Sequence, residues 1–223
     1  MLVALNEQRL HDFAAQLPTR CVSIAIDLRA PDAAQKIVEA TKERFGGIDI
    51  IVNNAGAPPR GDIHALSDAA WEDAFALKFF GAMRLCRAAW PQLKARRGCI
   101  VNIAGAAGRT GAADFAAHGA VNAALLNLTK VLADRGIGDG VRVNAINPGF
   151  IATERMPARL AAYAAQKNIS EAEAARRMPA AYGLERFGLP EEVAAVAAFL
   201  ASAEAAYIQG AIFDVDGGLT RTL

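Results

Sequence analysis

Cysteine and aromatic residues are scarce in this chain, and charges of the two signs nearly balance. The 223 residues include three cysteines, and aromatic residues make up 7%. Cys21, Cys86 and Cys99 have neither zinc-ligand nor CxxC spacing and lie in or beside apolar segments. We therefore expect buried, reduced thiols and no metal site. The formal net charge of +1 implies no polyelectrolyte partner such as a nucleic acid.

Long apolar runs are also missing. No run reaches the roughly 20 residues that a membrane span needs, and Glu7 and Arg9 interrupt the short apolar start, which argues against a signal peptide. We expect a cytoplasmic protein with no membrane partner. A content of 53% hydrophobic and 21% charged residues is ordinary for a globular protein, and we interpret residues 1–223 as a single domain.

What the chain does have is an alternation of short apolar runs with longer amphipathic segments. This alternation predicts an α/β fold with a parallel sheet. The expected strands are Leu2–Leu5, Cys21–Ile26, Ile48–Val52, Cys99–Ile103, Val141–Ala145 and Ala211–Val215. The expected helices are Asn6–Gln16, Pro31–Phe45, Asp68–Arg96, Ala112–Asp134 and Pro190–Ala201. Pro31 and Pro190 suit first helical turns, whereas Pro91 should end or kink its helix.

Several motifs carry a resemblance to a known family. They are Asn53-Asn54-Ala55-Gly56, the stretch Gly105–Asn122, Asn147-Pro148-Gly149, Tyr207-Ile208-Gln209-Gly210 and Asp216-Gly217-Gly218. Together they resemble the short-chain dehydrogenase/reductase family, from Leu2 to Gly218. The resemblance implies a Rossmann-like, doubly wound, three-layer α/β/α fold. It also implies hydride transfer between NAD or NADP and a small carbonyl or alcohol substrate.

The resemblance places a cofactor site along the carboxyl ends of the strands, where small residues let a dinucleotide approach the backbone. The implied cofactor-binding residues are Asp27, Leu28, Asn54, Ala55, Gly56, Pro148, Gly149, Ile151 and Thr153. Asp27 would lie at the adenine end, and the loop from Pro148 to Thr153 at the nicotinamide end. Alternatively, Asn53–Gly56 and Pro148–Thr153 are plain turns after strands, and Asp27 is an acidic residue that precedes a helix near Pro31. The positions that choose between NAD and NADP, Ala4 to Asn6, offer neither an acid nor a base.

The start of the chain departs from the family pattern. Family members place a strand, a Thr-Gly-x-x-x-Gly-x-Gly turn and a helix before the point that matches Leu2–Leu5. That glycine turn brings a helix N-terminus to the cofactor pyrophosphate. The first βα unit would supply a strand between Leu2–Leu5 and Ile48–Val52, and without it about ten ladder hydrogen bonds of about 1 kcal/mol each would be lost. We hypothesise a start codon assigned too late or a truncated gene, and cofactor binding is in doubt without this turn.

The reaction centre departs from the pattern as well. The family moves the proton with an Asn, a Ser, a Tyr and a Lys, and the matching positions here are Lys78, Gly105, His118 and Asn122. His118 and Asn122 share a helix face at i, i+4 spacing, and a histidine can exchange a proton near neutral pH. We hypothesise that His118 replaces the Tyr while Lys78 supplies the charge and favours neutral His118. In the alternative, His118 only packs and Lys78 is solvated.

A run of glycines, Gly105, Gly108 and Gly111, follows the strand Cys99–Ile103 and allows a second interpretation as a phosphate loop. Its spacing is not G-x-G-x-x-G. By position, it matches the loop that carries the family's catalytic serine.

Thr153–Gly188 breaks the alternation with two Ala-rich segments. They predict helices Met156–Lys167 and Glu171–Met178, the second opened by a capping box of Ser170 and Glu173. By resemblance this segment, about residues 153–188, is a small lobe over the active site; a packing flap is the alternative. The lobe does not identify the substrate.

Three functions remain open from the sequence. The first is an oxidoreductase of the family with a non-standard catalytic site, acting on a small molecule. The second is a catalytically inactive dinucleotide-binding or oligomer-partner protein, and the third a truncated, non-functional product. The resemblance also implies a homodimer or homotetramer, with the helix Ala112–Asp134 in one interface.

Overall fold

The computed structural model describes residues 1–56 and 58–221, and its strands form two parallel sheets. The smaller sheet pairs β1 (Leu2–Ala4) with β2 (Ser23–Ala25). The larger has the order β3 (Ile50–Asn53), β4 (Cys99–Ile103), β5 (Arg142–Pro148) and β6 (Ile212–Val215). All pairings between these strands are parallel. The parallel α/β fold expected from the alternation is confirmed.

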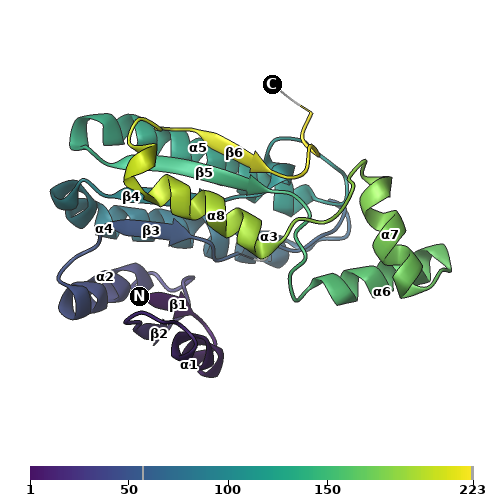
Figure 1. Ribbon diagram of the computed structural model, residues 1–223, viewed down its shortest axis with the longest axis horizontal. Coiled ribbons are helices and arrows are strands. Elements are labelled where there is room, and N and C mark those ends of the chain that lie inside the picture. Colours follow the sequence, from purple (N-terminus) through teal and green to yellow (C-terminus); the bar gives the residue numbers. More distant parts are fainter. Residues whose placement is uncertain (57, 222–223) are drawn as a thin grey trace.

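The strands β1 and β3 do not pair, as expected from the sequence. Figure 1 shows β1, β2 and α1 (Glu7–Ala15) grouped apart from the larger sheet. The β3 edge of that sheet is open, because Ile50 and Val52 are 50% and 47% exposed.

Helices cover both faces of the four-stranded sheet. Figure 1 shows α8 (Pro190–Ala201) in front of it, and α4 (Ala82–Arg96) and α5 (Ala116–Asp139) behind it. The remaining helical elements are α2 (Ala33–Phe45), α3 (Asp68–Phe75), the π-helical turn η1 (Ala76–Gly81), the 3-10 turns η2 (Ala106–Gly108) and η3 (Ala203–Ala205), α6 (Met156–Lys167) and α7 (Glu171–Ala181).

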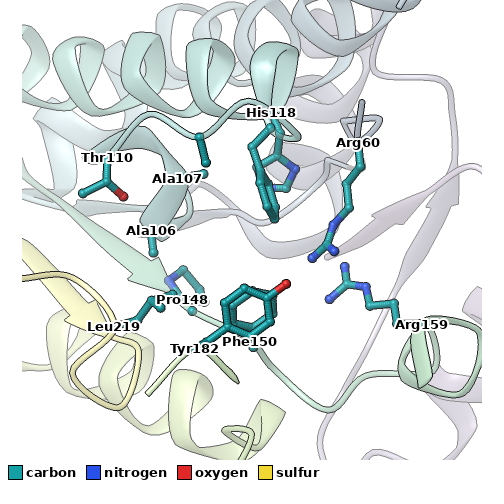
Figure 2. A pocket seen from close by; sticks show the side chains of 13 residues that line it. Arg60, Ala106, Ala107, Thr110, His118, Pro148, Phe150, Arg159, Tyr182 and Leu219 are labelled. Atoms are coloured by element: carbon teal, nitrogen blue, oxygen red, sulfur yellow. The ribbon is translucent and has the colours of Figure 1, made fainter. Parts of the chain in front are cut away.

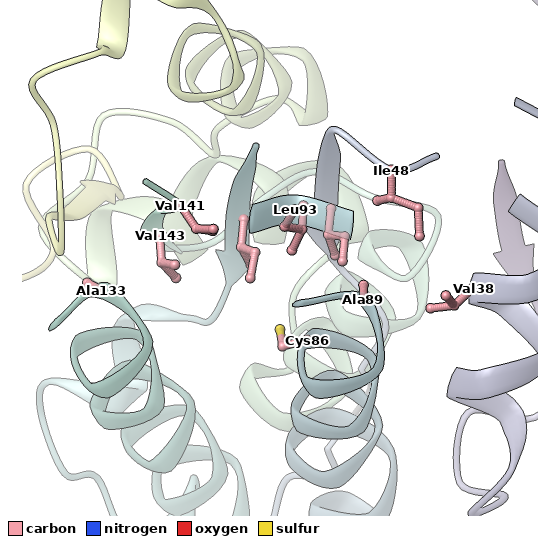
Figure 3. Packing of buried hydrophobic residues seen from close by; sticks show 10 residues of the cluster. Val38, Ile48, Cys86, Ala89, Leu93, Ala133, Val141 and Val143 are labelled. Carbon is pink, nitrogen blue, oxygen red and sulfur yellow. The ribbon is translucent and has the colours of Figure 1, made fainter. Parts of the chain in front are cut away.

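Alternate residues along the central strands separate two cores. Ile100 and Val143 pack with Leu93 of α4 on one face. Figure 3 shows Val143 and Leu93 in this cluster. Val101 of β4 and Ile146 of β5 pack with Leu200 of α8 on the other face. Strands buried on both faces are mostly apolar, and all five residues of β4 are buried, with Asn102 as the one polar residue among them.

The predictions about proline were met in part, because Pro190 opens α8 but Pro31 does not lie in a helix. Pro31 lies in the turn before α2, which begins at Ala33 with Asp32 as its N-cap. Pro91 does not end its helix, because α4 continues to Arg96. Proline removes one backbone hydrogen-bond donor from the helix. Ending the helix at Pro91 would cost more free energy, because it would expose the following turn, whose Leu93 is 0% exposed in the core.

The long predicted helix Asp68–Arg96 is divided by the π-helical turn η1. The predicted helix Ala112–Asp134 instead begins at Ala116 and runs to Asp139, where Gly140 ends it with a left-handed φ of 72°. Elsewhere β4, α6 and α8 have the predicted bounds, and the other boundaries shift by a few residues.

The helices α6 and α7 pack on each other and project from the end of the sheet (Figure 1). The Ser170 hydroxyl accepts a 3.2 Å hydrogen bond from the backbone nitrogen of Glu173, which confirms that half of the predicted capping box. The Glu173 carboxylate forms an ion pair with Arg177. The helix continues past the predicted end to Ala181, through Pro179.

Candidate active site

The carboxyl ends of β3, β4 and β5 meet at one edge of the sheet, because neighbouring parallel strands end on the same side. The register aligns Asn53 with Asn102 and Ile103 with Ile146. A cavity of about 200 Å³ lies beyond this edge. Its lining includes His118 of α5 and Pro148 and Gly149 at the end of β5 (Figure 2). Ligands of open α/β sheets bind in this kind of crevice.

His118 brings an ionisable group to the cavity. Its ring meets the Phe115 ring edge-on at 5.5 Å between centroids. Within the part of the chain that the structure describes, its buried Nδ1 has no hydrogen-bond partner. Desolvation, then the charge of Lys78, lower the pKa of His118 to about 4, against a smaller opposing effect of a hydrogen bond with the backbone of Pro58. His118 is therefore neutral near pH 7, as the hypothesis requires.

Lys78 lies on the π-helical turn and is 7% exposed. Its Nζ donates a 2.8 Å hydrogen bond to the carbonyl oxygen of Ala104, directly after β4. Burial, then the charge of Arg155, lower its pKa to about 8. The alternative that Lys78 is solvated is wrong. Its pKa lies close to neutrality, the range that suits proton exchange.

Gly56 makes room for this lysine. A Cβ at Gly56 would lie 2.7 Å from Cδ of Lys78, closer than two carbons can approach without a shift. The motif expected to contact the cofactor thus also shapes the path of the Lys78 side chain. The other predicted residues of this motif, Asn54 and Ala55, are exposed at the same carboxyl edge of the sheet.

Asn122 and Gly105 support the site without facing the cavity. Asn122 is fully buried, and its Nδ2 donates a 2.9 Å hydrogen bond to the backbone oxygen of His118. The backbone nitrogen of Gly105 donates to Asn147 Oδ1 at 3.2 Å. A Cβ at Gly105 would meet Asn122 Nδ2 at 3.0 Å. These two residues therefore hold the loop and helix around His118.

The glycine run after β4 packs against a helix. A Cβ at Gly108 would lie 2.9 Å from the backbone nitrogen of Ala123, so the loop touches the α5 backbone. Close packing explains Gly108, and the phosphate-loop interpretation gains no support from it.

The predicted residues after β5 surround the cavity rim. A Cβ at Gly149 would lie 2.8 Å from Cα of Asp216, which explains the glycine by packing. Ile151 forms a β-bridge with Gly188, which ties the loop to the end of the lobe. Thr153 is exposed beside it.

Asp27 is already engaged in its own turn. Its Oδ1 accepts a 2.9 Å hydrogen bond from the backbone nitrogen of Arg29 and lies 3.2 Å from Nη1 of the same residue. The backbone oxygen of Leu28 approaches Gly81, where a Cβ would lie 3.2 Å away. Asp27 remains partly exposed beside β2.

Arg60, Arg159 and Tyr182 are among the cavity residues that the sequence interpretation did not place at the site. They come from the loop after β3, from α6 and from the residue that follows α7, and no family motif contains them. The aromatic pair Phe150 and Tyr182 stacks at 4.3 Å between ring centroids, which joins the lobe to the cavity wall.

A chain of buried amides behind the cavity was also missed. Asn53 Nδ2 donates to Asn102 Oδ1 at 2.8 Å, and Asn102 Nδ2 donates to Thr129 Oγ1 at 2.9 Å. The chain links β3, β4 and α5. The sequence signal that could have predicted this chain is the pair Asn53 and Asn102, which occupy corresponding positions in two neighbouring strands.

Within the described residues, no helix is long and apolar enough to cross a membrane. The same residues contain no cluster of three or more His, Cys, Asp or Glu side chains that could hold a metal ion.

This parallel sheet, with helices on both faces and a cavity at its carboxyl edge, places the protein in the Rossmann-like class of α/β folds. A family sequence profile described as enoyl-(acyl carrier protein) reductase matches residues 1–220. The chain belongs to the short-chain dehydrogenase/reductase family, and the resemblance inferred from its motifs is confirmed.

One relative is the inactive 2-(S)-hydroxypropyl-CoM dehydrogenase 2 of Xanthobacter autotrophicus. It is 33% identical over 208 residues, which cover 93% of this chain and 88% of that protein.

Two solved structures are also similar. L-sorbose reductase from Gluconobacter frateurii, in complex with NADPH and L-sorbose, is 31% identical with a TM-score of 0.91, over 100% of this chain and 87% of that one. An NADPH-bound short-chain oxidoreductase from Pseudomonas aeruginosa, described as containing an atypical catalytic center, is 29% identical with a TM-score of 0.89, over 99% and 86% of the two chains.

Proposed function

We propose that this protein transfers a hydride between NAD or NADP and a small carbonyl or alcohol, with His118 and Lys78 in place of the family's proton-transfer residues. The observation that carries the proposal is the coupling of two ionisable groups at the carboxyl edge of the sheet: neutral His118 at the cavity and the buried ammonium of Lys78 behind it. Burial of a lysine ammonium without an ion pair costs folding free energy. Buried groups with perturbed pKa values cluster at functional sites, so the burial of Lys78 favours a functional role.

The two side chains have complementary tasks. Oxidation of an alcohol releases a hydroxyl proton, and neutral His118 accepts it at the substrate oxygen. In the reverse direction the Lys78 ammonium, whose pKa is about 8, passes a proton to neutral His118, which donates it to the substrate oxygen, and solvent then reprotonates the Lys78 amine. The hydrogen bond from Nζ to Ala104 holds Lys78 in position for this exchange.

The residues at the cavity fit the nicotinamide end of a dinucleotide. Pro148 and Gly149 line the cavity, and the exposed Thr153 carries a hydroxyl on the same loop. NAD(P)H, when bound, supplies the hydride. Solved structures that are similar to this chain contain NADPH, which supports the proposal of a nicotinamide cofactor. The glycine turn that holds the pyrophosphate in the family does not occur among residues 1–56 and 58–221.

The second candidate is a catalytically inactive member that binds the cofactor or a partner chain. A relative is named as an inactive dehydrogenase, and a histidine whose pKa is about 4 is a weak base at neutral pH. Cofactor binding without turnover distinguishes this candidate from the first.

The test has two stages. Titration with NADH and NADPH, followed by cofactor fluorescence, establishes whether either binds. Transfer of a hydride from 4-deuterated cofactor to a panel of small ketones then establishes turnover. His118→Ala and Lys78→Ala should lower turnover at least tenfold and leave cofactor affinity within about twofold. His11→Ala, at a side chain that is 80% exposed, is the matched control. Turnover that survives both substitutions would refute the assigned roles.

We also propose that the protein is one domain with residues 153–188 as a substrate lobe, and that it assembles as a homodimer or homotetramer. Val131 and Ile137 on α5 are 57% and 72% exposed, which supports a contact on that helix. Light scattering coupled to size-exclusion chromatography measures the assembly, and Val131→Lys should weaken it if α5 lies in the contact.

A further inference from the structure

Two arginines face each other across the cavity. Figure 2 shows the guanidinium groups of Arg60 and Arg159 turned toward one another near the Tyr182 hydroxyl. Arg60 comes from the loop after β3 and Arg159 from α6 of the lobe. Two separate segments of the chain thus bring like charges together in the cavity that His118 also lines.

Neither arginine forms an ion pair with another described residue. Among the described residues, Tyr182 and then Asp114 raise the pKa of Arg60 through electrostatic attraction, and neither forms an ion pair with it. This contrasts with arginines elsewhere in the chain, such as Arg29 and Arg186, which pair with carboxylates at hydrogen-bond distance. The cavity arginines keep their donors available.

The surroundings hold the guanidinium groups in place and remove water from them. Arg60 is an exposed residue as a whole, but its guanidinium carbon lies 4.5 Å from the Phe115 ring centroid and 5.7 Å from that of Phe150. Desolvation lowers the pKa of Arg60. Desolvation, followed by the charge of Arg60, lowers the pKa of Arg159.

We propose that Arg60 and Arg159 form a binding site for an oxyanion on the substrate, so that the protein acts on small carbonyl or alcohol compounds that carry a carboxylate, sulfonate or phosphonate group. Guanidinium groups present paired N–H donors to such groups. An anion between the two arginines offsets their repulsion and satisfies their free donors. A cavity of about 200 Å³ admits a short substrate, with its anionic end at the arginines and its oxygen toward His118.

The proposal also connects the substrate to the proton-transfer group. The charges of Arg60 and Arg159 contribute, after desolvation and Lys78, to the low pKa of His118. A bound anion cancels part of this effect and raises the basicity of His118 only when the substrate is present. This deepens the proposed function, and it rests on that function for the identity of the cavity as the substrate site.

Binding can be tested without turnover. Isothermal titration calorimetry of the protein with acetoacetate and with its neutral methyl ester compares two ligands that differ mainly in charge. 2-Oxopropanesulfonate and 2-oxopropylphosphonate, titrated in parallel, identify which oxyanion the site prefers. We expect at least one of the three anions to bind at least tenfold more tightly than the ester, and added salt to weaken that anion alone.

Variants locate the site. Arg60→Gln and Arg159→Gln should each weaken binding of the preferred anion about tenfold and leave binding of the ester unchanged. Arg176→Gln is the matched control, because Arg176 is an exposed residue of α7 that does not line the cavity. This substitution removes one positive charge from the lobe and should change the affinity for neither the anion nor the ester. Thermal unfolding of each variant verifies that it is folded.

The outcomes separate this inference from the proposed function. Equal affinity for all three anions and the ester, or a preference for anions that persists in the Arg60→Gln/Arg159→Gln double variant, would overturn the oxyanion site. Loss of turnover in His118→Ala together with equal affinities would retain the proposed function and refute only the anionic substrate. Anion binding that disappears in the double variant while no hydride transfer is found would retain the site and refute the reaction.

Discussion

The Nζ of Lys78 and the carbonyl oxygen of Ala104, 2.8 Å apart, join a π-helical turn to the end of the central strand β4. A π-helical turn inserts one extra residue into a helix and is often found at functional sites. Here it directs an ammonium group into the protein, where Gly56 leaves space for its side chain. The lysine is held by one backbone acceptor, and its charge acts on His118.

Removal of the Lys78 charge should raise the pKa of His118. Lys78 is the second largest cause of the depression to about 4, after desolvation. In Lys78→Met the desolvation remains, so we expect the pKa of His118 to rise while staying below its usual value of about 6.5. NMR titration of the imidazole ring measures it, with exposed His11 as the internal control. An unchanged His118 pKa would show that the two groups are not coupled.

The pH dependence of ketone reduction should report Lys78. Its pKa of about 8 means that the ammonium is present at neutral pH and is lost as the pH rises through that value. If Lys78 replenishes the proton, the rate should be constant near neutrality and fall with pH above about 8. The pH profile of kcat should lose this break in Lys78→Met. A break at the same pH in the variant would assign it to another group.

Folding stability should depend on His118 in weakly acidic solution. The pKa is about 4 in the folded protein and about 6.5 in an unfolded chain. Between these values the unfolded chain binds more protons, so stability increases as the pH rises from about 4 to about 6.5 and is unaffected by this group above that window. We expect about 1–3 kcal/mol, since the ring is only partly buried.

Urea unfolding of the wild type and His118→Gln at several pH values measures this contribution. The variant should lose less stability on acidification than the wild type does. Parallel pH dependences of the two proteins would contradict the depressed pKa.

Much of the fold and part of the site could be predicted from the sequence. The central strands are short apolar runs between clear turns, so their pattern suffices. The separation of β1 from β3 followed from family order. Counting along the motifs assigned Lys78 to the reaction centre. Its burial could not be deduced from the sequence, because lysine is usually solvated and only the tertiary packing of the π-helical turn encloses it.

The arginines of the cavity were beyond sequence reasoning for a physical reason. Arg60 and Arg159 are far apart along the chain, and each looks like an ordinary surface residue. Only the folding of the lobe against the sheet edge brings their charges together. Pro91 shows a similar limit, because the local rule allowed a helix end or a kink, and the helix does not end there but continues into the buried turn that holds Leu93.

Two glycines of α5 should respond in opposite ways to alanine. A Cβ at Gly136 would lie 2.1 Å from the carbonyl oxygen of Val141, a backbone atom that cannot move aside, whereas a Cβ at Gly138 has no atom within 4 Å. We expect Gly136→Ala to destabilise the protein by about 1–3 kcal/mol. Gly138→Ala should stabilise it by about 0.5–1 kcal/mol through helix propensity. Thermal or urea unfolding measures both, and equal effects would be inconsistent with this packing.

The buried amide chain should behave as a coupled unit. Asn102 Nδ2 donates to Thr129 Oγ1 at 2.9 Å, and both residues are 0% exposed. Thr129→Val leaves that amide without its acceptor and should cost about 1–3 kcal/mol. Asn102→Ala should cost at least as much, because it removes the acceptor of Asn53 as well.

A double-mutant cycle tests the coupling. Once Asn102 is absent, Thr129→Val has less left to disrupt, so the double variant should be more stable than the sum of the single effects predicts, by about 0.5–3 kcal/mol. Asn144 is the matched control, because its amide bonds Ile208 and Ala211 instead. Asn144→Ala and Thr129→Val should therefore be additive within about 0.5 kcal/mol. Additivity of the Asn102 pair would mean that the hydrogen bond contributes nothing, and the order at the carboxyl edge would then rest on apolar packing alone.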